Sequence, residues 1–395
     1  SRVTYSAAAG TALATGRKTK NSAIGVLKDQ ETPINSVAVW AKNKGCRVGI
    51  ATSVTVNHAT PGAFYAHAAK RTLYHEIGKD LYKTGFDFYA GSDFRDATDK
   101  NNPTTDNLYE MAGKNGYTIA RGYKDYLKQS KKADKMLLLQ TEEASKREFV
   151  AIPYAIDRKK GEMTLQDITR SAINFLSKDL SKGFFLMVEG GKIDWACHAN
   201  DAAAVFNEVK DMDNAVKVAY EFYKKHPKET LIVITADHET GGIVLGTGKY
   251  ALNLKALQYQ KHSADGLSQR ISELRKSKDN KVTWEDMKTF LGEEMGFWKQ
   301  FPISWEQEKK LRDEFEKSFV KNKVVFAESM YSKNEPMAAR AKEVMDEIAM
   351  IGWVSGGHSA GYVPVFAIGA GSQLFGEKID NTEIPKRIAK AAGYK

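Results

Sequence analysis

The 395-residue sequence lacks several features that would place it in a specialised class of protein. It has no apolar run of 18 or more residues, so no membrane span is expected. It has two cysteines, Cys46 and Cys197, whose spacing matches no paired-cysteine metal motif. Two free thiols are the default expectation, and a disulfide stays open. Internal repeats and low-complexity tracts are also absent, which excludes a repeat architecture.

The N-terminus has no initiating methionine and no apolar signal segment. Only five residues precede the first candidate motif, at Ser6. We therefore expect the sequence to be trimmed at this end.

Charged residues are plentiful but are not gathered into long runs of one sign. The chain has 59 Lys and Arg against 49 Asp and Glu, a net charge of +10. Basic pairs such as Lys131-Lys132 and Lys159-Lys160 are scattered, which indicates solvated faces and gives no reason to expect nucleic acid as a partner. The positive balance favours an anionic substrate or surface through long-range attraction.

The order of apolar and helical segments predicts an α/β fold. The chain is too long for one ordinary core, and its alternating strand and helix patterns are typical of a mostly parallel sheet. Strands are expected over residues 47–53, 86–90, 117–121, 136–140, 149–153, 184–188, 231–236, 243–245 and 363–370. Helices are expected over residues 6–16, 33–44, 164–176 and 201–225.

The pattern changes between about residues 249 and 350, where apolar density falls. Charged helical segments are expected there over residues 267–276, 284–294 and 305–317. Strand patterns resume only at Trp353. We therefore predict a core made of residues 1–248 and 351–395, interrupted by a mostly helical cap over residues 249–350 that lies beside the mouth of the site.

The most informative stretch follows the apolar strand at residues 184–188. Glu189, a Gly-Gly turn, Asp194 and His198 come directly after it. Because Asp194 and His198 are four residues apart, one helical turn can direct both at the same point. Carboxylate oxygen with imidazole nitrogen suits zinc. On this stretch alone, a buried acid–histidine pair that closes a strand explains the residues equally well.

A second apolar strand, at residues 231–236, ends in the same kinds of residue, Asp237 and His238. Neighbours on a strand point to opposite faces, so both can reach one ion only where the backbone leaves strand geometry. Two such strand ends are difficult to explain by packing. His358, which is flanked by glycines, would complete a three-ligand site.

A nucleophile and a phosphate-binding cation are also candidates. Ser6 opens a helix of small residues, where unpaired N–H groups and the helix dipole stabilise an anion. A metal ion on its oxygen would lower the pKa of the hydroxyl. A plain N-cap serine is the alternative. Arg71 can offer two parallel hydrogen bonds to a phosphoryl group, and an exposed helix arginine is its alternative.

Taken together, these residues resemble the alkaline phosphatases, phosphomonoesterases with two zinc ions and one magnesium ion. The resemblance covers residues 3–245 and runs again from 353 to the end, and it implies a three-layer α/β sandwich with a central, mostly parallel sheet. The segment Val3-Thr4-Tyr5-Ser6-Ala7-Ala8 resembles the family's nucleophile motif. It implies that Ser6 is phosphorylated in a covalent intermediate and that Arg71 binds the phosphate.

The resemblance also implies the metal ligands, which come from segments far apart in the chain. For the first zinc it implies Asp194, His198 and His358; for the second, which activates Ser6, it implies Asp237 and His238; for magnesium it implies Glu189 and Thr60, with His58 as a residue that tunes this third metal.

Some positions depart from the family pattern. Tyr5 stands where the family has an Asp that helps to hold the arginine, so Arg71 is expected to be held less firmly. Trp195 stands where some members have Lys. The family's first core strand ends in a metal-bridging Asp within a Gly-Asp-Gly-Met-Gly-like turn, and this sequence has no such segment. We therefore expect the first zinc site to be best ligated, the magnesium site to be weak and the sheet to lack a strand.

The resulting hypothesis is an enzyme that hydrolyses small-molecule phosphate monoesters by two in-line displacements. A phosphodiesterase or sulfatase relative with the same metal core stays open, as does a non-catalytic metal- or phosphate-binding fragment. Thr60, Glu189 and Arg71 favour the monoesterase, because a third cation and an arginine suit a dianionic group. A periplasmic or secreted location and a homodimer are expectations from family resemblance only.

Overall fold

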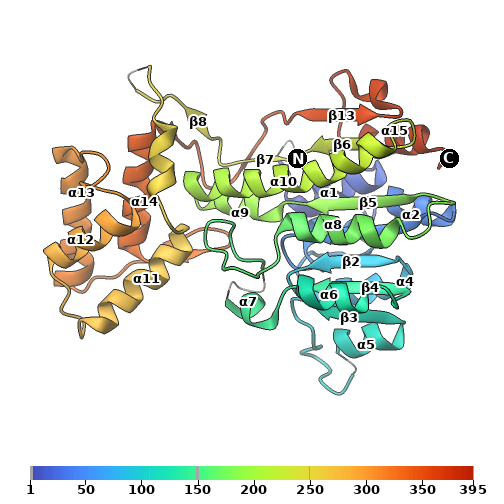
Figure 1. Cartoon of the computed structure of the whole chain (residues 1–395), viewed down its shortest axis with the longest axis horizontal. Helices are drawn as coiled ribbons and strands as arrows, with labels where there is room; N and C mark the ends of the chain where they lie inside the picture. Colours follow the sequence, from blue (N-terminus) through green and yellow to red (C-terminus); the bar gives the residue numbers. More distant parts are fainter. Residues whose placement is uncertain (1–2, 106, 148–150, 249, 395) are drawn as a thin grey trace.

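The computed structural model describes residues 3–105, 107–147, 151–248 and 250–394. At its centre lies an all-parallel sheet of five strands in the order β3-β4-β2-β1-β5 (Figure 1). In chain order these strands are β1 (Arg47–Thr52), β2 (Phe88–Gly91), β3 (Tyr117–Arg121), β4 (Lys135–Leu139) and β5 (Phe184–Glu189). The α/β fold class with a central parallel sheet is confirmed.

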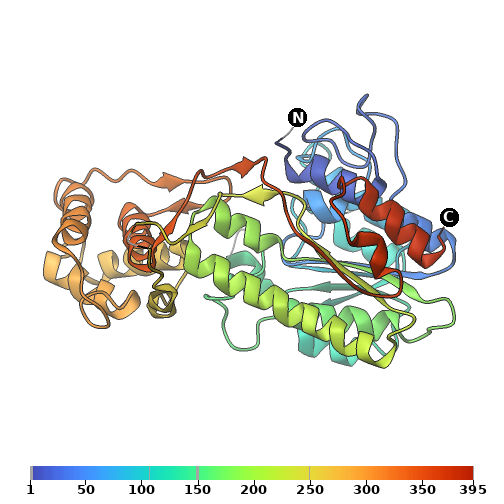
Figure 2. The same cartoon turned by 90° about the horizontal axis from the view of Figure 1, so that it is seen from above.

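Helices cover both faces of this sheet, as Figure 2 shows from above. One face carries α6 (Tyr123–Gln129), α8 (Leu165–Leu176) and α10 (Ala202–Lys225). The other carries α1 (Ser6–Thr15), α2 (Val37–Asn43), α3 (Ala59–Gly62), α4 (Tyr74–Lys83), α5 (Leu108–Lys114) and α15 (Glu383–Ala392). Two short helices, α7 (Glu142–Arg147) and η3 (Ser372–Phe375), lie in connections. No helix in the described residues is both long enough and apolar enough to span a membrane.

Alternate residues along the central strands pack into two different hydrophobic layers. Tyr89 and Leu137 belong to the layer that includes α1 and α2, whereas Phe88 and Met136 pack with Phe175 of α8. Successive side chains on a strand point to opposite faces, and here both faces are covered. This is why the central strands are apolar at nearly every position.

A separate antiparallel pair joins β6 (Leu231–Thr235) to β13 (Val365–Gly369). Among the described residues, neither strand pairs with the five-stranded sheet. Every residue of β5 and β6 is only partly buried, whereas every residue of β2 is buried. The described chain therefore forms an interrupted sheet, with one unpaired edge on β5 and another on β6. Helix α10 packs against both α8 and β6 and so connects the two parts.

The described part of residues 249–350 is mostly helical and lies at one end of the molecule (yellow to red-orange in Figure 1). It contains η1 (Leu254–Tyr259), α11 (Ala264–Ser277), α12 (Trp284–Glu294), α13 (Trp305–Phe315), the π-helical turn η2 (Glu316–Val320), a hairpin of β9 (Ala327–Glu328) and β10 (Lys333–Asn334), and α14 (Pro336–Ala349). Its buried apolar residues, among them Leu267 and Met287, form a core that also includes Ala202 at the start of α10. The division at residues 249 and 350 stays a prediction.

One helix start differs from the sequence-based expectation, and the start of α1 agrees with it. The helix expected over residues 33–44 begins only at Val37, because the Ser36 side chain caps it by accepting a hydrogen bond from Val39 N at 3.2 Å. Helix α1 begins at Ser6 and ends before Gly16, whose φ of 72° suits glycine. Its N-cap is Tyr5, so Ser6 is the first helical residue and not the N-cap.

Two expected strands also differ. The strand expected over residues 149–153 falls partly on residues 148–150, which lie outside the described residues; residues 151–153 form no strand, and Ile152 N donates to Ser53 O at 3.1 Å. The strand expected over residues 243–245 shortens to β8 (Val244–Leu245), which pairs antiparallel with β11 (Ile351–Gly352).

Candidate metal centre and active site

Candidate ligands converge from segments that are distant in the sequence. Helix α9 (Gly191–His198) follows β5 and carries Asp194 and His198 on consecutive turns. His238 follows β6 and directly precedes β7 (Glu239–Thr240). Strand β12 (His358–Ser359) pairs antiparallel with β7, with His358 opposite Thr240. This pairing brings His358 to the end of β6.

Asp194, His238 and His358 form a group of metal-ligand type. One ligand atom from each lies within 4.8 Å of the other two. His198 adjoins the group, because its Nε2 lies 3.1 Å from His358 Nε2 and 3.5 Å from Asp194 Oδ1. The rings of His238 and His358 stack with centroids 3.6 Å apart. A carboxylate with several imidazoles is a donor set that suits zinc. The three residues predicted for the first zinc thus lie together, with His238 beside them.

Asp194 is the anionic centre of this group. Thr240 Oγ1 donates a hydrogen bond to Asp194 Oδ1 at 2.6 Å. Burial opposes ionisation of Asp194, but its interactions with His358, His198 and His238 outweigh burial and lower its pKa to about 2. Burial lowers the pKa of His238 to about 4. The pKa of His358 is raised because Asp194 outweighs the effect of burial. The carboxylate of Asp194 is therefore well compensated.

Glu189 and Asp237 are less well compensated. Burial raises the pKa of Glu189 to about 7, although Thr52 donates a hydrogen bond to its carboxylate. Burial, and then the charge of Asp194, raise the pKa of Asp237 to about 7. Asp237 Oδ2 lies 3.2 Å from His238 Nε2 but has no hydrogen bond of acceptable geometry within the described residues. Buried carboxyls whose charge is not fully offset are what a metal ion would compensate.

Ser6 reaches the same group from the far end of the chain. Ser6 is buried at the N-terminus of α1, with 4% of the residue exposed. Its Oγ lies 3.1 Å from His238 Nε2. Because Ser6 does not cap its own helix, its hydroxyl is free to face the histidines. The Ser6 hydroxyl therefore lies beside this cluster, and its role as nucleophile stays a prediction.

Arg71, His58 and Thr60 lie on another side of the site. Arg71 Nη2 is 3.1 Å from His58 Nε2, and His58 precedes α3, which contains Thr60. Thr60 also interacts with the Glu189 carboxyl through its side chain. Burial and the charge of Arg71 hold the pKa of His58 well below its usual range. His58 Nδ1 is buried without a hydrogen-bond partner within the described residues.

Sequence reasoning missed two site residues. Thr240, which holds Asp194, stands two positions after His238, and that proximity was a usable signal. Tyr331 lies in the segment predicted as cap, yet its ring stacks on Trp195 with centroids 4.5 Å apart and 11° between planes. Its hydroxyl accepts a hydrogen bond from Arg71 Nη2 at 3.1 Å. No local pattern around Tyr331 indicates this contact.

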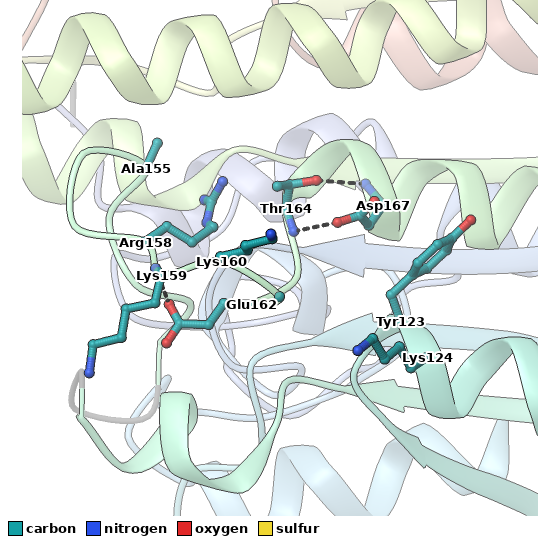
Figure 3. A pocket seen from close by; sticks show the side chains of 10 residues that line it. Tyr123, Lys124, Ala155, Arg158, Lys159, Lys160, Glu162, Thr164 and Asp167 are labelled. Carbon is teal, nitrogen blue, oxygen red and sulfur yellow. Dashed lines mark hydrogen bonds between the residues drawn. The ribbon is translucent and has the colours of Figure 1, made fainter.

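A separate cavity of about 500 Å³ opens between the segment at residues 155–164 and the starts of α6 and α8 (Figure 3). Two of its charged residues already have partners, because Arg158 pairs with Asp211 at 2.8 Å and Glu162 with Arg147 at 2.7 Å. None of the ten residues that line it is a predicted site residue. The cavity is therefore distinct from the candidate active site.

The sequence profile of the alkaline phosphatase family matches residues 1–87 and 87–394. The chain belongs to the alkaline phosphatase family. Alkaline phosphatase 3 of Bacillus subtilis (strain 168) is 34% identical over 412 positions, which cover 99% of this chain and 78% of the relative. Alkaline phosphatase 4 of the same organism is 32% identical over a match that covers 98% of this chain and 76% of that relative. The enzyme class expected from the sequence is confirmed.

Solved structures of alkaline phosphatases resemble the whole chain. The cold-active enzyme from the psychrophile Shewanella sp. is 28% identical, with a TM-score of 0.78 over 98% of this chain and 85% of that chain. The enzyme from the Antarctic bacterium TAB5 is also 28% identical, with a TM-score of 0.68 over 100% and 86%. These likenesses agree with the α/β architecture described above.

Proposed function

We propose that this alkaline phosphatase hydrolyses phosphate monoesters through a phosphoserine intermediate on Ser6. One observation carries the proposal. The Ser6 hydroxyl, at the N-terminus of α1, lies 3.1 Å from His238 Nε2 within the group formed by His238, Asp194 and His358. A hydroxyl in that position has a metal-ligand group on one side and the positive end of a helix dipole on the other.

We propose that the site holds two zinc ions and one magnesium ion. The residues present fit at least one ion, because ligand atoms of Asp194, His238 and His358 lie within 4.8 Å of one another, and Asp237 Oδ2 is buried without a hydrogen bond among the described residues. The ligands would be Asp194, His198 and His358 for the first zinc, Asp237 and His238 for the second, and Glu189 and Thr60, beside His58, for magnesium. In a histidine variant of the TAB5 enzyme, Mg occupies a site designated M3. Bound ions of this kind lower the pKa of a hydroxyl or water and stabilise phosphoryl charge.

The chain's own residues would bind and orient the ester. Arg71 offers two parallel N–H donors to the phosphoryl oxygens, and the first N–H groups of α1 add positive potential at the same point. The Ser6 hydroxyl loses its proton as its oxygen forms a bond to phosphorus, while the bond from phosphorus to the ester oxygen breaks and that oxygen takes up a proton. Water then attacks phosphorus, and inorganic phosphate leaves as the Ser6 hydroxyl is regenerated. Before phosphorylation, the Ser6 hydroxyl lies 3.1 Å from His238 Nε2.

Turnover of three nitrophenyl esters by the chain with added zinc and magnesium tests the proposal. We expect p-nitrophenyl phosphate to be hydrolysed much faster than bis-p-nitrophenyl phosphate or p-nitrophenyl sulfate. Faster hydrolysis of the diester or the sulfate would favour the phosphodiesterase or sulfatase alternative. Zinc binding without any turnover would favour a non-catalytic fragment.

We also propose, on family resemblance alone, a periplasmic or secreted location and a homodimer. Subcellular fractionation measures the first, and sedimentation of the purified chain measures the second. A cytoplasmic monomer would contradict both.

A further inference from the structure

Tyr331 lies at the tip of the β9–β10 hairpin, and the hairpin is tightly closed. Ser329 N donates to Ser332 O at 2.9 Å, and Ser332 N donates to Ser329 Oγ at 3.1 Å. The two serine hydroxyls are themselves 2.7 Å apart. These bonds leave the side chain of Tyr331 projecting from a rigid turn.

The base of the hairpin is fixed to α11. Asn334 Nδ2 donates to Asp265 Oδ1 at 2.5 Å, and Glu335 N donates to Ser268 Oγ at 2.9 Å. Arg275, near the end of α11, pairs with Glu335 at 2.8 Å. The hairpin is therefore part of the helical segment that follows residue 249, although its tip reaches the active site.

Tyr331 differs from its apolar neighbours in where it points. Val325, Phe326 and Met330 are exposed, with exposed fractions of 63%, 44% and 48%. The ring of Tyr331 instead stacks on Trp195 and meets the ring of His58 edge-on at 6.0 Å. The face contact with Trp195 and the edge contact with His58 together restrict the orientation of the Tyr331 ring. Its hydroxyl is consequently held in place to accept the hydrogen bond from Arg71.

The guanidinium of Arg71 has few other anchors. Among the described residues, its side chain is hydrogen-bonded to His58 Nε2 and to the Tyr331 hydroxyl, and no ion pair fixes it. Tyr5, immediately before the nucleophile, contacts His358 with ring centroids 5.9 Å apart and is not bonded to Arg71. A planar guanidinium binds two phosphoryl oxygens well only when its orientation is fixed.

We propose that Tyr331 is a positioning residue that orients Arg71 for phosphoryl binding. The phosphate affinity of the site then depends on the packing of the helical segment against the core. This inference rests on the proposed function, because it takes Arg71 as the phosphate-binding arginine. A guanidinium that contacts phosphate equally before and during reaction changes KM more than kcat.

The test compares Tyr331→Phe, Arg71→Ala and the double variant with the wild-type chain. Tyr331→Phe removes only the hydroxyl, and it should raise both KM and the inhibition constant of inorganic phosphate by about 3- to 10-fold, the value of one hydrogen bond, while kcat changes less than about twofold. In the Arg71→Ala background the same change should have no further effect. Tyr259→Phe, in η1, is the matched control, because that ring packs against Phe301 and should leave both constants unchanged.

Each result separates this inference from the proposed function. If Tyr331→Phe binds phosphate as the wild type does, or if its effect is equally large in the Arg71→Ala background, Tyr331 does not act through Arg71 and the inference fails alone. If the wild-type chain neither hydrolyses monoesters nor binds phosphate, both proposals fail. Melting temperature and zinc content of Tyr331→Phe should match the wild type; a drop in either together with the loss of binding would indicate a structural role and overturn the inference.

Discussion

The two halves of the active site differ in how their negative charge is compensated. Around Asp194, three imidazoles and the Thr240 hydroxyl surround one carboxylate, whose pKa falls to about 2. At Glu189 and Asp237 burial raises both pKa values to about 7. The first half is a nearly closed set of donors, whereas in the second half His358 offsets only part of the effect of burial on Asp237.

The fold accounts for this difference. Asp194 lies on α9, and His358 is tied to the segment after β6 by the pairing of β12 with β7. Glu189 ends β5 and Asp237 follows β6, and these are the two strands that face the interruption in the sheet. Most of the Asp194 group therefore lies on a helix and a paired ladder, whereas Glu189 and Asp237 lie at the ends of two strands that each have an unpaired edge.

The largest expected effect comes from breaking the compensated half. Asp194→Ala removes the carboxylate shared by the imidazoles, so bound zinc should fall and turnover of p-nitrophenyl phosphate should drop by about a thousandfold or more. Glu189→Ala should lower magnesium content while most zinc stays bound. Metal analysis by mass spectrometry and steady-state kinetics measure both. Unchanged zinc in Asp194→Ala and in His358→Ala would contradict the assignment of the first half.

The interruption in the sheet should be visible in amide hydrogen exchange. Amides of β1 and β2, bonded within a covered sheet, should be strongly protected, whereas some amides of β5 and β6 should exchange about 10- to 100-fold faster because one edge of each strand is unpaired. Exchange read by mass spectrometry at peptide resolution tests this. Equal protection of all four strands would mean that another segment or another molecule covers the β5 and β6 edges.

Thr240→Val tests how much the Thr240 hydroxyl contributes to zinc affinity in the compensated half. The change removes the hydrogen bond to Asp194 and the 3.2 Å contact with His238 Nδ1, so zinc affinity should fall by about 10-fold while the fold is kept. Thr235→Val is the matched control, because in the described part of the chain its hydroxyl bonds only to the Ala236 and Pro364 carbonyls. Zinc competition with a chelating dye measures the affinities. Equal affinities for the two variants would show that Asp194 needs no such support.

The smallest expected effect lies outside both halves, at His262. Its Nδ1 is 3.2 Å from Asp157 Oδ1 and its Nε2 is 3.3 Å from Glu294 Oε2, while Arg270 opposes its charge. The hydrogen bond to Asp157 raises the pKa of His262. A raised pKa gives stability that is fully present below the ordinary value and is lost as pH rises through the raised value.

His262→Gln should therefore lower the melting temperature by about 1–2 °C at pH 6, and the difference should vanish at pH 9. Calorimetry at the two pH values measures it. A difference that grew toward pH 9 would mean that the neutral imidazole, and not the cation, makes the stabilising contacts with Asp157 and Glu294.

The features of this site that the sequence predicts are those set by residues close together in the chain. Residues 184–188 and 231–236 were recognisable as strands, and Asp194 and His198 as one helical turn, because each depends on a short pattern of apolar and polar residues. The pairing of β6 with β13 and the contact of Tyr331 with Arg71 join residues far apart in the chain, and no local pattern encodes them. Ser6 was placed at the correct helix end, but its helical position required the conformation of Tyr5.

The most direct test of the central claim is to trap the phosphorylated enzyme. The chain is incubated with p-nitrophenyl phosphate, quenched in acid during turnover and digested, and the phosphorylated peptide is identified by mass spectrometry. The account predicts one phosphoserine, at Ser6, which disappears in Ser6→Ala together with turnover while zinc stays bound. Phosphate on a different residue, or near-full turnover by Ser6→Ala, would contradict it.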